Sequence, residues 1–77
     1  MHLVIAKVDE VFFDGDAVSV TVPGSEGEMT ILSEHMPLVT TLKSGTIVVR
    51  PTSGAEMRFE VEGGVLEVTG ESATVIL

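Results

Sequence analysis

Turn-forming residues interrupt this chain at intervals of 6 to 13 residues along its whole length. They are Asp14-Gly15-Asp16, Pro23-Gly24, Met36-Pro37, Ser44-Gly45, Pro51 to Gly54, Gly63-Gly64 and Gly70. Such spacing is typical of turns between short strands, and no interval is long enough to predict a helix. Of the 77 residues, 13 are valine, 4 are isoleucine and 8 are threonine, and these β-branched side chains favour pleated sheet. We therefore predict an all-β chain.

Period-two alternation supports this prediction. Apolar and charged residues alternate over 57–61, and valine alternates with serine and threonine over 18–22, as expected for strands with one dry face. We predict strands over residues 2–8, 16–22, 28–32, 38–42, 46–50, 56–62, 65–69 and 72–77. Eight short strands without intervening helices predict a small antiparallel β-sandwich or flattened barrel.

Three segments depart from alternation. Residues 2–5, 47–49 and 75–77 are continuously apolar, which predicts either strands covered on both faces or an apolar patch kept for a partner.

We assign six side chains to the core, namely Leu42, Ile47, Phe59, Val61, Leu66 and Val68.

The charge balance narrows the possible partners. Four Lys and Arg against twelve Asp and Glu give a net charge of −8, whereas nucleic-acid binding needs clusters of basic residues. Nucleic acids and anionic membrane surfaces are therefore not expected as partners. The negative charge either attracts basic protein surfaces or simply keeps a small apolar protein soluble.

The sequence offers few groups for chemistry. With no cysteine, a zinc site would have to combine His2 or His35 with carboxylates from separate strands, and none is predicted. Ser33-Glu34-His35 holds the residue types of a hydrolytic triad, but neighbouring side chains on an extended chain point to opposite faces. We predict no enzymatic activity and no cofactor.

Two glycine-containing segments resemble ligand loops only superficially. The segment 23–28 lacks the Lys-Ser/Thr of a phosphate-binding loop and carries two carboxylates, so we interpret it as an acidic loop between strands. Asp14-Gly15-Asp16 begins like a calcium loop, but the later acidic ligands do not follow at the required spacing. We predict a plain turn there.

Four motifs in register resemble one known family. They are Phe13-Asp14-Gly15, the acidic segment from Val22 to Leu32, the segment from His35 to Gly45 with its H-x-P-L-V-T-x-L-x-x-G pattern, and Phe59 to Val68 with its double glycine. Together they resemble the amino-terminal domain of the epsilon subunit of rotary F-type ATP synthases, a β-sandwich of about ten short strands. Where the family commonly has Pro-Gly before the histidine, this chain has Ser33-Glu34, which adds a charge to that loop.

The resemblance implies a non-catalytic rotor role. Family members lie at the foot of the central stalk, peripheral to the cytoplasmic side of the bacterial plasma membrane, and tie the gamma subunit to the c-ring so that ion translocation is coupled to ATP synthesis. We expect residues 1–77 to form one such domain, associated with the membrane through the complex and without direct insertion. The two-helix hairpin that follows in most members has no counterpart up to Leu77. Its inhibitory and nucleotide-binding roles are therefore not expected.

The resemblance also implies contact residues. Glu26, Gly27 and Glu28 lie on the loop that faces the c-ring in the family, whose ring loops tend to carry a basic residue. Contact with gamma or the ring is expected from Lys7, His35, Pro37 and Leu38, although turn geometry and core packing also account for Pro37 and Leu38.

Two other functions remain open from the residues themselves. Small acidic all-β domains also serve as lipoyl or biotinyl carriers, for which Lys43 is the candidate, although it lacks the usual flanking residues. The other is a stand-alone binding module.

Overall fold

The computed structural model describes residues 1–34 and 36–77 and contains eight strands and no helix within them. The strands are β1 (His2–Lys7), β2 (Glu10–Gly24), β3 (Gly27–Leu32), β4 (Leu38–Leu42), β5 (Gly45–Pro51), β6 (Met57–Val61), β7 (Gly64–Thr69) and β8 (Ser72–Ile76). The predicted all-β architecture is therefore confirmed.

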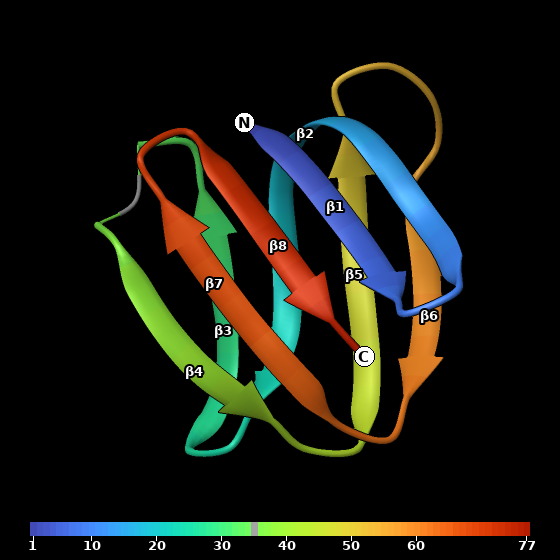
Figure 1. The fold of residues 1–77 in the computed structure, drawn as a ribbon. Helices are drawn as coiled ribbons and strands as arrows, with labels where there is room; N and C mark the ends of the chain where they lie inside the picture. The colour runs from blue at the N-terminus through green and yellow to red at the C-terminus, as the bar shows by residue number, and fades with distance from the viewer. Residues whose placement is uncertain (35) are drawn as a thin grey trace.

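The strands form two layers that share the long strand β2. Figure 1 shows β1, β8, β7 and β4 side by side in front of β3, β2, β5 and β6. The first half of β2 pairs with β1, and its second half pairs with β3 and β5. All pairings are antiparallel except that of β1 with β8, which is parallel. The fold is the predicted β-sandwich with one parallel pair.

The core lies between the two layers. Its buried apolar side chains are Leu3, Ile5, Ala17, Val20, Val22, Ile31, Leu42, Ile47, Val49, Val61, Leu66, Val68, Ala73 and Val75. Five of the six predicted core residues are among them, whereas Phe59 is only partly buried and packs against the core from its margin. A fully buried Ile or Leu contributes roughly 1.5–3 kcal/mol through removal of apolar surface from water.

The predicted turn at Asp14-Gly15-Asp16 is wrong. These residues lie inside β2, where Asp14 pairs with Val4 and Asp16 pairs with His2. The neighbouring strand satisfies the backbone groups that a turn would otherwise satisfy internally, so β2 runs from Glu10 to Gly24 instead of starting at residue 16. The real reversal is the turn at Val8 and Asp9. The other seven predicted strands agree with the structure to within one residue at each end.

A register shift in β2 explains a second error. Strict alternation predicts Val18 inward and Ser19 outward, but Val18 is 53% exposed and Ser19 is 8% exposed. The pairing of β2 with β5 shifts between Ala17 and Ser19, and such a bulge turns the following side chains to the other face. The bulge occurs where β2 leaves one layer for the other.

The continuously apolar segments are not covered on both faces. Val4 and Val48 are half-buried and Ile76 is exposed, while their neighbours Ile5, Ile47 and Val75 are fully buried. Strand alternation therefore holds in these segments, and their outward side chains add apolar surface to the sandwich.

Candidate functional site

The predicted acidic loop is the turn between β2 and β3. Gly24 pairs with Gly27 and Pro23 pairs with Glu28, so the hairpin reverses over Ser25 and Glu26. Gly27 has φ +138°, a conformation that L side chains rarely adopt, which is why glycine is needed there. The side chains of Glu26 and Glu28 are exposed. Sequence reasoning thus located this turn and its two free carboxylates.

Hydrogen bonds fasten this turn to the end of β4. The Ser25 hydroxyl lies 3.0 Å from the Thr41 carbonyl and 2.6 Å from the Thr41 hydroxyl, and the Ser25 amide donates to the same carbonyl at 3.0 Å. The Lys43 amide donates to the Pro23 carbonyl at 2.9 Å. The acidic turn is therefore held in place by its neighbour.

Two more connections lie at the same end of the sandwich. The β4–β5 connection at residues 43–44 lies next to the β2–β3 turn, and the β6–β7 turn at residues 62–63 lies at the same end, on the other side of the β4–β5 connection (Figure 1). A Cβ built at Gly45 would lie 2.8 Å from the Pro23 side chain, so these connections pack closely. Glu26, Glu28 and Glu62 are exposed at this end, with Lys43 as the nearby cation. We call these four residues the acidic end.

The other predicted contact residues do not form one cluster with each other. Lys7 pairs with Glu10 at the β1–β2 hairpin, and its Nζ lies 5.8 Å from the Phe12 ring centroid. Leu38 begins β4, pairs with Val68 and is half-buried, and exposed Pro37 precedes it. Strands β8 and β7 separate β1 from β4 in the sheet. His35 lies outside the described residues.

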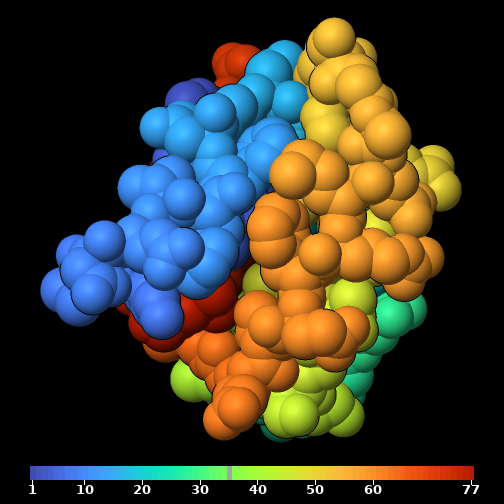
Figure 2. Space-filling view, turned by 90° about the vertical axis from the view of Figure 1, so that its right-hand side faces the viewer, coloured from blue at the N-terminus to red at the C-terminus, as the bar shows by residue number. Residues whose placement is uncertain are grey.

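A groove that sequence reasoning missed separates the β1–β2 hairpin from β6 (Figure 2). Phe12, Val61 and Leu77 contribute its apolar lining, and the Phe12 and Phe59 ring centroids lie 6.4 Å apart. Contacts between residues so distant in the sequence leave no local pattern that could have predicted the groove.

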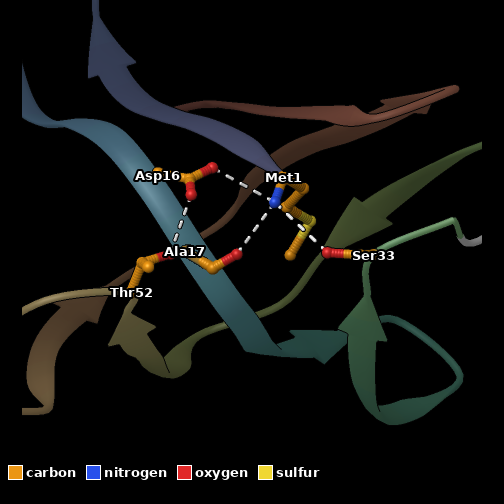
Figure 3. Close-up of polar contacts among 5 residues, drawn as sticks. All are labelled: Met1, Asp16, Ala17, Ser33 and Thr52. Carbon is orange, nitrogen blue, oxygen red and sulfur yellow. Dashed lines mark hydrogen bonds and ion pairs between the residues drawn. The ribbon is translucent and has the colours of Figure 1, made fainter.

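A polar cluster around the amino terminus was also not predicted (Figure 3). The α-ammonium group of Met1 lies 3.0 Å from the Ala17 carbonyl, 3.2 Å from the Ser33 hydroxyl and 3.3 Å from Asp16 Oδ1. The Thr52 hydroxyl donates to Asp16 Oδ2 at 2.9 Å. This hydrogen bond and the α-ammonium group of Met1 hold the pKa of the Asp16 carboxyl below its usual value.

Within residues 1–34 and 36–77, no three His, Asp or Glu side chains are grouped closely enough to hold a metal ion. The same residues contain no helix long and apolar enough to cross a membrane.

The chain matches known proteins over its full length. A family model described as the β-sandwich domain of the ATP synthase delta/epsilon chain matches residues 1–77. The chain is 39% identical over 77 residues to the ATP synthase epsilon chain of Sulfurovum sp. strain NBC37-1, covering 100% of this chain and 60% of that protein. It is 40% identical over 77 residues to the ATP synthase epsilon chain of Bordetella avium strain 197N, covering 99% of this chain and 54% of that protein.

Solved structures support the fold. One similar chain is in the cryo-EM structure of the Euglena gracilis mitochondrial ATP synthase containing OSCP, F1 and c-ring, with a TM-score of 0.87 and 22% identity over 99% of this chain and 49% of that chain. Another is in the central stalk and c-ring of the Tetrahymena thermophila mitochondrial ATP synthase, with a TM-score of 0.83 and 19% identity over 99% of this chain and 61% of that chain. At these identities the similarity shows the fold.

The matches discriminate between the functions left open by the residues. The family match includes the Lys43 segment, so it favours the epsilon-type interpretation over a carrier domain. The chain spans about half the length of the curated relatives it matches. It covers 60% of the Sulfurovum protein, 54% of the Bordetella avium protein and 52% of the ATP synthase epsilon chain of Xanthomonas campestris pv. campestris strain B100. On the strength of the full-length family match and these identities, the chain belongs to the family of ATP synthase delta/epsilon chain β-sandwich domains.

Proposed function

We propose that this domain is a non-catalytic central-stalk component of an F-type ATP synthase that links the gamma subunit to the c-ring and so couples ion translocation to ATP synthesis. The observation that carries the proposal is the family match over residues 1–77, together with relatives named ATP synthase epsilon chain. On this proposal the domain is peripheral to the cytoplasmic side of a bacterial plasma membrane, and its partners hold it there.

The architecture suits a mechanical link. The two layers share β2 and enclose one core, so a force applied to one layer is transmitted to the other through packed side chains. Close-packed protein interiors have low compressibility and transmit strain. A domain of this kind can carry torque between two partners without bond chemistry of its own.

The c-ring contact is proposed at the acidic end. Glu26 and Glu28 project from a turn that Ser25 and Thr41 hold in place, so little ordering is needed when a partner docks. A basic residue on the facing ring loops would complement these carboxylates. Charge pairs at an exposed rim set orientation and association rate more than affinity.

A contact with gamma or with the c-ring is proposed at the start of β4 and, separately, at Lys7. Pro37 and the neighbouring Val39 are exposed beside half-buried Leu38, which leaves apolar surface for a partner. His35 belongs to this proposal by its position in the sequence. Lys7, at the β1–β2 hairpin, would make a contact separate from these residues.

Binding to gamma is the first test of the proposal. The 77-residue chain is mixed with the purified gamma subunit of the same ATP synthase and analysed by size-exclusion chromatography. We expect one-to-one co-elution. Separate elution of a chain shown to be folded by far-UV circular dichroism would contradict docking by this domain alone, and intact mass for a modification of Lys43 would then test the carrier alternative.

The acidic end is tested by charge reversal. Glu28→Lys is expected to weaken binding to the purified c-ring and to reduce ATP-driven ion pumping in the assembled enzyme. Glu71→Lys makes the same change at the β7–β8 turn, at the opposite end of β7, and is the matched control. Equal pumping and ring binding in the wild type and Glu28→Lys would refute the proposed role of the acidic end.

A further inference from the structure

Both arginines of the chain lie on one face of the sandwich. Arg50 is in β5 and Arg58 is in β6, where it pairs with Val48. Because alternate residues of a strand share a face, Arg50 and Val48 point the same way, whereas Val49 between them is buried in the core. The two guanidinium groups therefore lie on the outer face of the rear layer in Figure 1, the layer of β3, β2, β5 and β6.

Glu56, just before β6, contacts both guanidinium groups. Its Oε2 lies 3.2 Å from Arg58 Nη2, and its Oε1 lies 3.8 Å from Arg50 Nε. The Glu56 side chain is 38% exposed, whereas those of Arg50 and Arg58 are 70% and 65% exposed. Among residues 1–34 and 36–77, no other side-chain hydrogen bond or ion pair engages either guanidinium group. Each group has five N–H donors, so Glu56 orients the pair and leaves most donors free.

A groove of about 390 Å³ lies beside the two arginines. Thr30, Thr21, Val48 and Arg58 form one row across β3, β2, β5 and β6 and contribute to its lining. The Thr21 and Thr30 hydroxyls lie 3.0 Å apart, so one donates to the other and one hydroxyl proton stays available. Leu32 also lines the groove and is 55% exposed. The groove thus offers polar donors next to apolar surface.

Apolar surface also lies on the other side of Arg50. Val18 lines a second hollow together with Arg50 and Glu56, and it is exposed because of the bulge in β2. Arginine is enriched at the centres of protein interfaces, where it is flanked by apolar side chains. We call Arg50, Glu56 and Arg58, with Val18 and Leu32, the arginine face. Its composition is that of an interface.

The charge on this outer surface changes sign along β5. Glu60 pairs with Thr46 and accepts a hydrogen bond from its hydroxyl at 2.7 Å. Thr46 and Arg50 are four residues apart, which is about 13 Å along a strand. Exposed charges separated by more than the Debye length, about 8 Å at physiological ionic strength, are largely screened. The two guanidinium groups and Glu56 therefore present one local positive charge, although the whole chain carries −8.

We propose that the arginine face is a docking surface for an acidic segment of a partner protein. A carboxylate of that segment binds both guanidinium groups, and its apolar neighbours cover Val18 and Leu32. Guanidinium groups match carboxylates through paired N–H donors. A carboxylate suits the single net charge of the face, whereas a phosphate group carries nearly two negative charges and would lie beside Glu56.

This surface differs from the acidic end, which would bind a basic partner. One domain would then hold two partners of opposite charge on separate surfaces. The inference rests on the proposed function, because it places the acidic segment within the same ATP synthase.

Zero-length cross-linking in the assembled ATP synthase tests the inference. Arg58→Lys places an amine on the arginine face, and Glu56→Gln in the same chain removes the carboxylate that would react with it internally. A water-soluble carbodiimide joins amines to carboxylates in contact, and mass spectrometry identifies the product. We expect a link from position 58 to an aspartate or glutamate of another subunit. Glu71→Lys, which places an amine on the β7–β8 turn of the other layer, is the matched control and should give a yield at least tenfold lower.

Affinity provides a second measurement. Arg50→Gln combined with Arg58→Gln removes both charges without altering the core, and the chain is titrated against purified complex from which it has been removed. We expect the dissociation constant to rise roughly tenfold and to depend less on salt. Urea midpoints verify that each variant is folded, and Arg50→Gln alone decides if the double variant does not fold.

The outcomes separate this inference from the proposed function. If the wild-type chain does not join the complex, the proposed function is refuted and the inference with it. If it joins, but position 58 forms no link to another subunit or no more links than Glu71→Lys, the docking surface alone is refuted. An internal link to Glu56 in the free Arg58→Lys chain shows that the introduced amine is reactive. Unchanged affinity of the folded glutamine variant would also overturn the inference.

Discussion

The Ser25 hydroxyl lies 2.6 Å from the Thr41 hydroxyl, and this contact joins the acidic turn between β2 and β3 to the last residues of β4. The two residues belong to different layers of the sandwich. The Thr41 carbonyl also accepts a hydrogen bond from the Ser25 amide, so both the backbone and the side chain of Ser25 bind the turn to β4. We therefore expect the uncharged Ser25 side chain to help orient the Glu26 and Glu28 carboxylates.

Replacing Ser25 by alanine tests this dependence. The variant loses the hydroxyl contacts but keeps the amide bond to Thr41, so we expect a stability loss of roughly 0.5–1.5 kcal/mol in urea unfolding. We also expect a slower association with the c-ring, because the carboxylates of the turn would be less well oriented. Surface plasmon resonance against immobilised c-ring measures the rate.

Ser53→Ala is the matched control for Ser25→Ala. Ser53 is an exposed serine in the β5–β6 connection, away from the β2–β3 turn. Equal rates of association with the c-ring for the two variants would contradict the proposed role of the Ser25 contact.

Much of the fold follows from local sequence pattern. Segment 57–61 alternates, turn residues such as Ser44-Gly45 and Gly63-Gly64 mark the connections between strands, and seven strands lie within one residue of prediction because these signals are local. The errors concentrate in β2, where pairing with β1 overrides the turn preference of Asp14-Gly15-Asp16, and where a bulge reverses Val18 and Ser19. Both depend on a partner strand, which single-sequence periodicity does not represent.

In the candidate functional site, too, local features could be predicted from the sequence and contacts between strands could not. Glu26 and Glu28 could be located because a glycine-bounded acidic hairpin is a local feature, and the resemblance supplied its interpretation. The hydrogen bonds of Ser25 with Thr41 and of Met1 with Ser33 could not be predicted, because these residue types do not indicate their partners until the strands pair. Tertiary contacts of this kind need the fold itself.

The bulge in β2 yields a prediction about two neighbouring valines. Val20 is fully buried and Val18 is 53% exposed. Val20→Thr would bury a hydroxyl in the apolar core, which costs roughly 1–3 kcal/mol, whereas Val18→Thr should change the free energy of unfolding by less than about 0.5 kcal/mol. Urea unfolding of both variants measures the difference, and similar losses for the two would show that the register of β2 is not the one described.

The loop after β3 contains a residue in an unfavourable backbone conformation. Glu34 has φ +66°, in the left-handed region that favours glycine. Glu34→Gly should remove a strain of about 1–2 kcal/mol, offset in part by the larger entropy of glycine in the unfolded chain. We expect a net rise in the urea midpoint.

Glu34→Ala separates the backbone effect from the loss of the charge. Alanine removes the carboxylate but still has a Cβ, so it should not reproduce the stabilisation by glycine. Equal midpoints for the alanine and glycine variants would mean that φ at residue 34 is not what limits stability.

The Asp16 carboxylate predicts a pH dependence of stability. Its pKa in the folded state lies below the usual value, first because of the Thr52 hydroxyl and then because of the Met1 ammonium group. A carboxyl whose pKa falls on folding stabilises the native state fully above its unfolded pKa, about 3.9 for aspartate, and this contribution is lost as the pH falls through the lower, folded pKa. Wild-type stability should therefore decrease below about pH 4.

Comparison with Asp16→Asn isolates this contribution from that of the other carboxylates, which titrate in both proteins. Urea midpoints measured from about pH 6 to pH 2 should fall more steeply for the wild type, so that the two curves converge at the acidic end of the range. Since Asp16 is exposed, the difference should shrink in 0.5 M salt, because mobile ions screen the attraction between the carboxylate and the ammonium group. Parallel curves over the whole range would show that the Met1 ammonium group and Thr52 do not stabilise the ionised form of Asp16.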